Sequence, residues 1–175
     1  MNTPFDRAKA SVTIPTDPAT AFRMFTEETG LWWRKGVRFR VAGRYPGEVL
    51  FEARPGGRLL ESFETPQGTR VVELGQITAW EPPHRFCFEW RGANFAPHEK
   101  THVEVLFEAV GGGTFVTVVH TGWANLRADH PVRHGADGTT FIRTTAMWWG
   151  DQLTALREHY AKKAAPGFLG AAFFQ

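Results

Sequence analysis

The sequence predicts one α+β domain, in which a curved antiparallel sheet of about six or seven strands wraps around a long C-terminal helix. Three observations support this fold class. The chain has 175 residues, 42% of them apolar, which suits one domain with a sizeable core. Between Gly47 and Gly122 the sequence alternates as strands do, with turn signals and no helical period. From about Thr139 to Lys163 an apolar stripe follows helical spacing.

The first elements are predicted to be a strand and two short helices. Residues 8–14 alternate in polarity, which indicates a half-buried strand. Asp17 can then cap free backbone N–H groups, and Pro18 follows at a position where its missing donor costs nothing. The first helix is expected to bury Ala21, Phe22 and Phe25. A break at Gly30 separates it from a second helical piece that holds Leu31, Trp32 and Trp33.

Turn signals divide the middle section into five or six antiparallel strands. The connections are residues 54–57, 66–68, 81–84, 92–98 and 111–113. Glycines in these turns supply backbone freedom. They do not form a phosphate-binding loop, because the run Gly111-Gly112-Gly113 lies between two strands and not before a helix.

The C-terminal helix is expected to pack on the sheet through one apolar stripe. Its members are Ile142, Trp149, Leu153, Leu156 and Tyr160. Gly150 marks a bend or a close approach to the sheet, and Pro166-Gly167 ends the helix. We expect one domain over residues 1–167, followed by a short apolar tail over 168–175. The polar residues 124–138, ahead of the helix, predict a solvated loop.

Composition excludes several classes of protein. The net charge is only +2 and the 20 basic residues are spread along the chain, so we expect no nucleic-acid partner. No run approaches the roughly 20 apolar residues of a membrane span. Cys87 is the single cysteine, and the first ten residues lack an apolar signal region. These features predict a cytoplasmic protein.

Four short motifs, taken with the order of elements, carry a family resemblance. They are Pro55-Gly56-Gly57-Arg58, residues 80–86 (WEPPHRF), residues 114–123 (TFVTVVHTGW) and Trp149-Gly150. From about Ala8 to Ala161 the chain resembles the Hsp90-ATPase-activator-homologue branch of the START-like (SRPBCC, Bet v 1-like) superfamily. The resemblance implies a helix-grip fold. The superfamily includes lipid carriers, plant ligand-binding proteins and polyketide cyclases.

The resemblance gives little support to an Hsp90 contact. The eukaryotic co-chaperone that names this branch resembles the chain only in its C-terminal domain. The 175 residues leave no room for the N-terminal domain that makes the main contact with Hsp90. We therefore regard an Hsp90 contact as doubtful.

Strand alternation predicts which side chains face a cavity between the sheet and the C-terminal helix. On this basis, and because pockets usually combine aromatic walls with a few polar groups, eleven side chains are candidate ligand-binding residues. They are Trp33, Leu59, Glu61, Phe63, Trp80, Phe88, Trp90, Val105, Val118, His120 and Trp148. A register slip of one residue would reverse the assignments on a strand.

Glu61 and His120 are the polar members of these apolar faces. As a carboxylate and an imidazole in an apolar pocket, they are candidates for a catalytic acid–base pair. The alternative is that backbone groups, or each other, satisfy their hydrogen bonds.

Histidine spacing does not predict a metal site. His98 and His102 border a strand, where this spacing places them about 13 Å apart. His130 and His134 have Asp129 and Asp137 nearby, but no third firm ligand. We expect neither a metal nor a cofactor.

The leading hypothesis is a soluble binding protein for a small hydrophobic or aromatic molecule held between the sheet and the C-terminal helix. One alternative is a cyclase, hydrolase or isomerase that uses Glu61 and His120. Another is a stress-response or chaperone-interacting module, or a homodimer formed through the apolar residues Phe168 to Phe174 of the tail.

Overall fold

A computed structural model describes residues 6–42 and 45–165. Its strands are β1 (Ala8–Ile14), β2 (Gly47–Phe51), β3 (Arg58–Thr65), β4 (Gly68–Glu81), β5 (Arg85–Trp90), β6 (Thr101–Val110) and β7 (Gly113–Thr121). Its α-helices are α1 (Pro18–Glu27), α2 (Thr29–Trp32) and α3 (Gly138–Ala164). Short 3₁₀ turns cover Val37–Phe39, Trp123–Asn125 and Pro131–Arg133.

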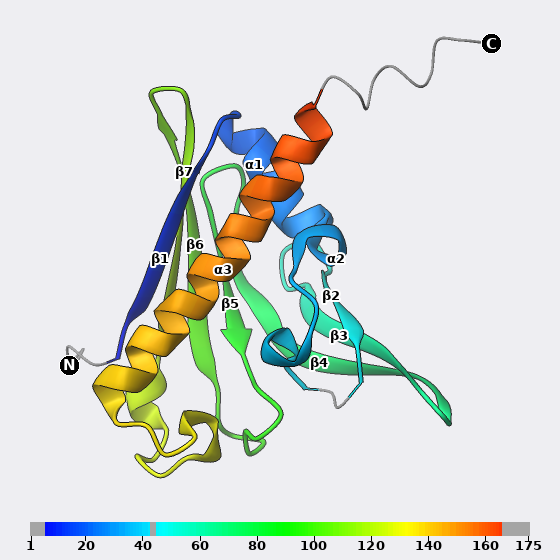
Figure 1. The fold of residues 1–175 in the computed structure, drawn as a ribbon, viewed down its shortest axis with the longest axis vertical. Coiled ribbons are helices and arrows are strands. Elements are labelled where there is room, and N and C mark those ends of the chain that lie inside the picture. The colour runs from blue at the N-terminus through cyan, green and yellow to red at the C-terminus, as the bar shows by residue number, and fades with distance from the viewer. Residues whose placement is uncertain (1–5, 43–44, 166–175) are drawn as a thin grey trace.

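The strands of the described residues form one antiparallel sheet in the order β1-β7-β6-β5-β4-β3-β2. The strands from β2 to β7 follow one another as a meander, and β1 pairs with β7 at the far edge. Helix α3 lies diagonally across the sheet. Helices α1 and α2 lie beside the C-terminal half of α3 (Figure 1). The expected fold class, with a curved sheet gripping a C-terminal helix and two short helices after the first strand, is confirmed.

Both longer helices begin at an aspartate cap. The Asp17 carboxylate accepts a hydrogen bond from the Thr20 backbone N–H at 3.1 Å, as predicted. At the start of α3, Asp137 accepts from the Thr140 N–H at 2.8 Å. Each bond satisfies a donor that the first turn of a helix leaves unpaired, so the sequence specifies where both helices begin.

Two glycines allow the backbone approaches that shape the sheet. A Cβ at Gly57 would collide with the Glu52 carbonyl oxygen inside the turn that joins β2 to β3. A Cβ at Gly75 would collide with the Glu89 carbonyl oxygen, close to where the pairing of β4 with β5 shifts in register. Such irregularities bend a long strand, and β4 turns here from one half of the sheet to the other (Figure 1).

The predicted strand faces are confirmed. Buried inward-facing side chains include Leu59, Glu61, Phe63, Phe86, Phe88, Trp90, Thr101, Val103, Val105, Phe107, Val116, Val118 and His120. On β6 the alternate residues His102 and Glu108 are exposed. The register therefore matches the hydrophobic pattern on these strands.

One end of the interface between sheet and helices is filled with phenylalanine. Phe22 and Phe25 of α1 pack on Phe86, whose ring centroid lies 5.7 Å and 5.5 Å from theirs. Phe51, Phe88 and Phe107 complete this group of rings, which we call the phenylalanine end. All six side chains are buried, and their edge-to-face and stacked contacts fill the space at this end.

Several local predictions need correction. Gly30 lies inside α2 and does not break it, and Leu31 is 72% exposed because it points away from the core. Residues 124–138 are not a uniformly solvated loop, since His130 and Arg133 are buried there. A methyl group at Gly150 would meet no atom within 4 Å, so α3 makes no close approach to the sheet at this position.

The apolar stripe of α3 is as predicted, with Trp149, Leu153 and Leu156 fully buried. The proposed helix stop at Pro166-Gly167 and the tail 168–175 lie outside the described residues. Among the helices of the described ranges, none has the length and apolar character needed to cross a bilayer.

Candidate functional site

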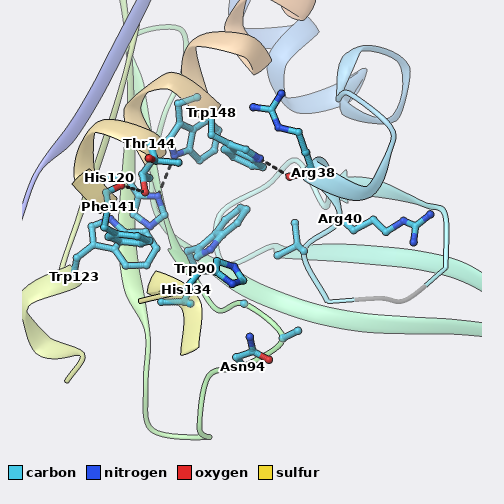
Figure 2. Close-up of a pocket in the computed structure, with 16 residues that line it drawn as sticks. Arg38, Arg40, Trp90, Asn94, His120, Trp123, His134, Phe141, Thr144 and Trp148 are labelled. Carbon is cyan, nitrogen blue, oxygen red and sulfur yellow. Dashed lines mark hydrogen bonds between the residues drawn. The ribbon is translucent and has the colours of Figure 1, made fainter. Parts of the chain in front are cut away.

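A pocket of about 320 Å³ lies beside the N-terminal half of α3, at the end of the interface away from α1 (Figure 2). Its walls carry five aromatic side chains, which we call the tryptophan end: Trp90, Trp123, Phe141, Trp148 and Trp149. The remaining lining residues are Arg38, Arg40, Val41, Gly92, Ala93, Asn94, His120, Val132, His134, Thr144 and Thr145. The lining is therefore largely aromatic, with a few polar groups.

The pocket has three kinds of wall, formed by strands of the sheet, by helix α3 and by connecting segments. Trp90 ends β5 and His120 lies near the end of β7, and these strands run in the same direction, so both residues point inward at the same end of the sheet. Phe141, Thr145 and Trp148 follow at steps of four and three, which places them on one side of α3. Residues 38–41, 92–94 and 132–134 close the pocket from three connecting segments.

Hydrogen bonds fix the orientation of the Trp148 and Trp149 rings. The Trp148 indole N–H donates to the Arg38 carbonyl oxygen at 2.8 Å, and the Trp149 N–H donates to His120 Nδ1 at 3.0 Å (Figure 2). The two rings stand nearly perpendicular, 5.0 Å apart between centroids. Because a tethered indole loses its hydrogen bond when it rotates, these rings resist collapse into the pocket.

His120 is a neutral part of the wall. Its Nδ1 accepts from Trp149, so Nε2 carries the proton and donates to Thr101 Oγ1 at 2.7 Å. Burial of the imidazole lowers the pKa of His120 to about 3, with a smaller contribution from the charge of His102. Both ring nitrogens are thus occupied, and the ring stays neutral at pH 7.

Glu61 lies in a different place from His120. It lines a second cavity of about 20 Å³, together with Trp33. Its carboxylate accepts from the Val41 N–H at 2.8 Å and from the Ala42 N–H at 3.3 Å. Glu61 therefore anchors the segment that forms one wall of the main pocket, and the described structure gives Glu61 and His120 no common substrate space.

The predicted site residues divide into three groups. Trp90, His120 and Trp148 line the main pocket, and Trp33 and Glu61 line the smaller cavity. The other candidates line neither of these cavities. Leu59, Phe63, Phe88, Val105 and Val118 are buried in the packed interior, and Trp80 is partly buried against it. The predicted inward faces are right, but much of the space that they face is filled.

Sequence analysis missed most of the pocket. Phe141 and Thr145 had a usable signal, since they lie two turns and one turn before Trp148 on the helix. No sequence signal pointed to Asn94 and His134, because they lie on loops whose positions depend on tertiary packing.

His130 joins two of the loops around the pocket. Its Nδ1 accepts from the Val132 N–H at 3.1 Å, and its Nε2 lies 3.3 Å from the Glu99 carboxylate. The Ala96 N–H and then His130 lower the pKa of Glu99. Within the described ranges no group of three or more His, Cys, Asp or Glu side chains has an arrangement suited to a metal ion.

A curved antiparallel sheet around a C-terminal helix, with a pocket between them, defines a START-like helix-grip domain. More narrowly, a family model described as Activator of Hsp90 ATPase homolog 1-like protein matches residues 15–155. The chain belongs to this family. None of the curated proteins matches it significantly.

Solved structures with similar folds come from several different organisms. A Rhodobacter sphaeroides protein has a TM-score of 0.62 at 18% identity, over 94% of this chain and 99% of that one. A Nitrosomonas europaea protein has a TM-score of 0.59 at 14% identity, over 93% and 98%. A Plasmodium falciparum protein described as an Hsp90 activator has a TM-score of 0.56 at 15% identity, over 89% and 96%. At these identities the similarity shows the fold alone.

Proposed function

We propose that this protein binds a small aromatic or apolar molecule in the pocket beside the N-terminal half of α3. The observation that supports the proposal is a cavity of about 320 Å³ with five aromatic side chains in its walls. Hydrogen bonds from Trp148 and Trp149 keep two of those walls in place without a ligand. A preformed apolar cavity of this kind binds planar ligands at a low ordering cost.

The volume favours a ligand of one or two rings. Ligand sites range from about 300 to 1,000 Å³, so this pocket is among the smaller ones. The phenylalanine end occupies the space into which a longer cavity would extend. A lipid with two acyl chains does not fit this arrangement.

The other hypotheses have less support. A reaction that uses Glu61 and His120 together lacks a shared pocket, and the hydrogen bonds of both residues point to a structural role. No contact among the described residues favours a chaperone-interacting module, which rests on the family description. The cytoplasmic location expected from the single cysteine stays a prediction.

Calorimetric titration with 1-naphthaleneacetamide, a neutral two-ring probe, tests the proposal. We expect Trp90→Ala to bind this probe about tenfold more weakly, because it removes one aromatic wall. His102→Ala is the matched control, since His102 is exposed on the outer face of β6. Circular dichroism of each variant verifies folding.

Equal losses in the Trp90 and His102 variants would contradict the pocket assignment. A wild-type protein that binds no such probe, and that carries no small molecule in native mass spectrometry after purification from its own cells, would contradict the function itself.

A further inference from the structure

The ionisable side chains that line the pocket are all basic. Arg38, Arg40 and His134 are among the lining residues, and no aspartate or glutamate is. Arg38 pairs with Asp151 at 3.4 Å, but both side chains are exposed, so water screens this pair strongly. Basic side chains around a pocket without a carboxylate disfavour a cationic ligand and favour an anionic one.

His134 is the basic residue best placed to contact a ligand. Figure 2 shows its imidazole beside Trp90 at the pocket, whereas the Arg40 side chain extends away. Within the described part of the chain, the His134 side chain is exposed and forms no hydrogen bond or ion pair with the protein. Its ring nitrogens are therefore available for hydrogen bonds to a ligand.

The backbone of His134 is unusual as well. Its φ of 47° is positive, and no other non-glycine residue of the described chain shares this feature. The left-handed conformation costs about 1 kcal/mol for a residue with a Cβ, and the neighbouring Gly135 adopts it without that cost. Local backbone strain of this kind concentrates at binding sites.

We propose that the ligand is an aromatic acid, with its rings against the tryptophan walls and its carboxylate hydrogen-bonded to the His134 imidazole. Asn94 and Thr144 line the same pocket and offer an amide and a hydroxyl for the second carboxylate oxygen. Arg38 adds positive potential at the rim. The inference rests on the proposed function, because it names the class of ligand for the same pocket.

The test compares 1-naphthaleneacetate with 1-naphthaleneacetamide, which have the same rings and differ in charge. We expect the wild-type protein to bind the acid about tenfold more tightly, through a charge-assisted hydrogen bond. His134→Gly should remove this preference, because it should weaken binding of the acid much more than binding of the amide. Glycine accepts the positive φ, so the variant should fold at least as well as the wild type.

His84→Gly is the matched control, because His84 is exposed before the start of β5, at the opposite end of that strand from Trp90. It should keep the preference for the acid. His134→Asn keeps a hydrogen-bond donor in a residue that tolerates the left-handed conformation, and should recover part of the preference.

Equal binding of acid and amide by the wild type would overturn the inference while leaving the proposed function intact. A preference for the acid that survives in His134→Gly would overturn the assignment of His134. Failure of both probes to bind would instead count against the proposed function.

Discussion

The two ends of the interface between the sheet and its helices are both aromatic, yet one is filled and the other holds a pocket. At the phenylalanine end, six rings from α1 and the sheet pack against one another. At the tryptophan end, the rings stand around a space of about 320 Å³. Aromatic content alone therefore does not decide where a cavity forms.

The difference lies in what each ring can bond to. A phenylalanine has no polar atom, so it settles wherever its contacts are best. Trp148 and Trp149 each donate an indole N–H to a fixed acceptor, which determines the orientation of the ring. The first end also has α1 to fill it, whereas loops cover the second (Figure 1).

Truncation at the two ends should have unequal effects on stability. Phe86 is fully buried and contacts five other phenylalanines, so Phe86→Ala should lower the free energy of unfolding by about 3–5 kcal/mol. Trp148→Ala, at the rim of the pocket, should cost about half as much or less. Urea unfolding measures both. An equal or larger loss for Trp148→Ala would mean that the tryptophan end is packed as tightly.

Acid should destabilise the protein through the tryptophan end. Burial lowers the pKa of His120 to about 3, against about 6.5 in the unfolded chain. Between these values the unfolded chain binds a proton that the folded protein does not, so stability falls as the pH falls. This residue alone should cost about 2 kcal/mol at pH 5 relative to pH 7.5.

The variant His120→Gln does not titrate in this range. Its free energy of unfolding should be lower at pH 7.5, because the hydrogen bonds to Thr101 and Trp149 are altered, but it should change about 2 kcal/mol less on going to pH 5. His84→Gly, which removes an exposed histidine, should keep the wild-type pH dependence. The same slope in the wild type and His120→Gln would contradict the buried neutral imidazole.

The sequence was a good guide to strand faces and a poor one to the cavity. Alternation placed Trp90 and His120 inward, because a half-buried strand leaves a period of two that the register must respect. The same reasoning named Leu59 and Phe88, which also point inward but meet packed neighbours. Facing the interior and lining a cavity are different properties, and only the second depends on what fills the space.

The sequence pattern does not predict the positions of the loop residues at the pocket. His134 acquires its position from a 3₁₀ turn and a left-handed backbone, and Asn94 from the connection between β5 and β6. Both residues lie outside helices and strands, so no periodic pattern predicts the direction of either side chain. The separation of Glu61 from His120 likewise depends on where residues 38–42 cross the interface, and no strand pattern encodes that path.

The most direct test of a ligand pocket at the tryptophan end is an NMR titration that follows the indole N–H resonances of the seven tryptophans. With 1-naphthaleneacetamide as the probe, the resonances of Trp90 and Trp148 should shift progressively and saturate. Those of Trp32 and Trp80, which pack beside α1 at the phenylalanine end, should stay in place. No shift in any tryptophan, or larger shifts at Trp32 and Trp80 than at Trp90 and Trp148, would contradict the account.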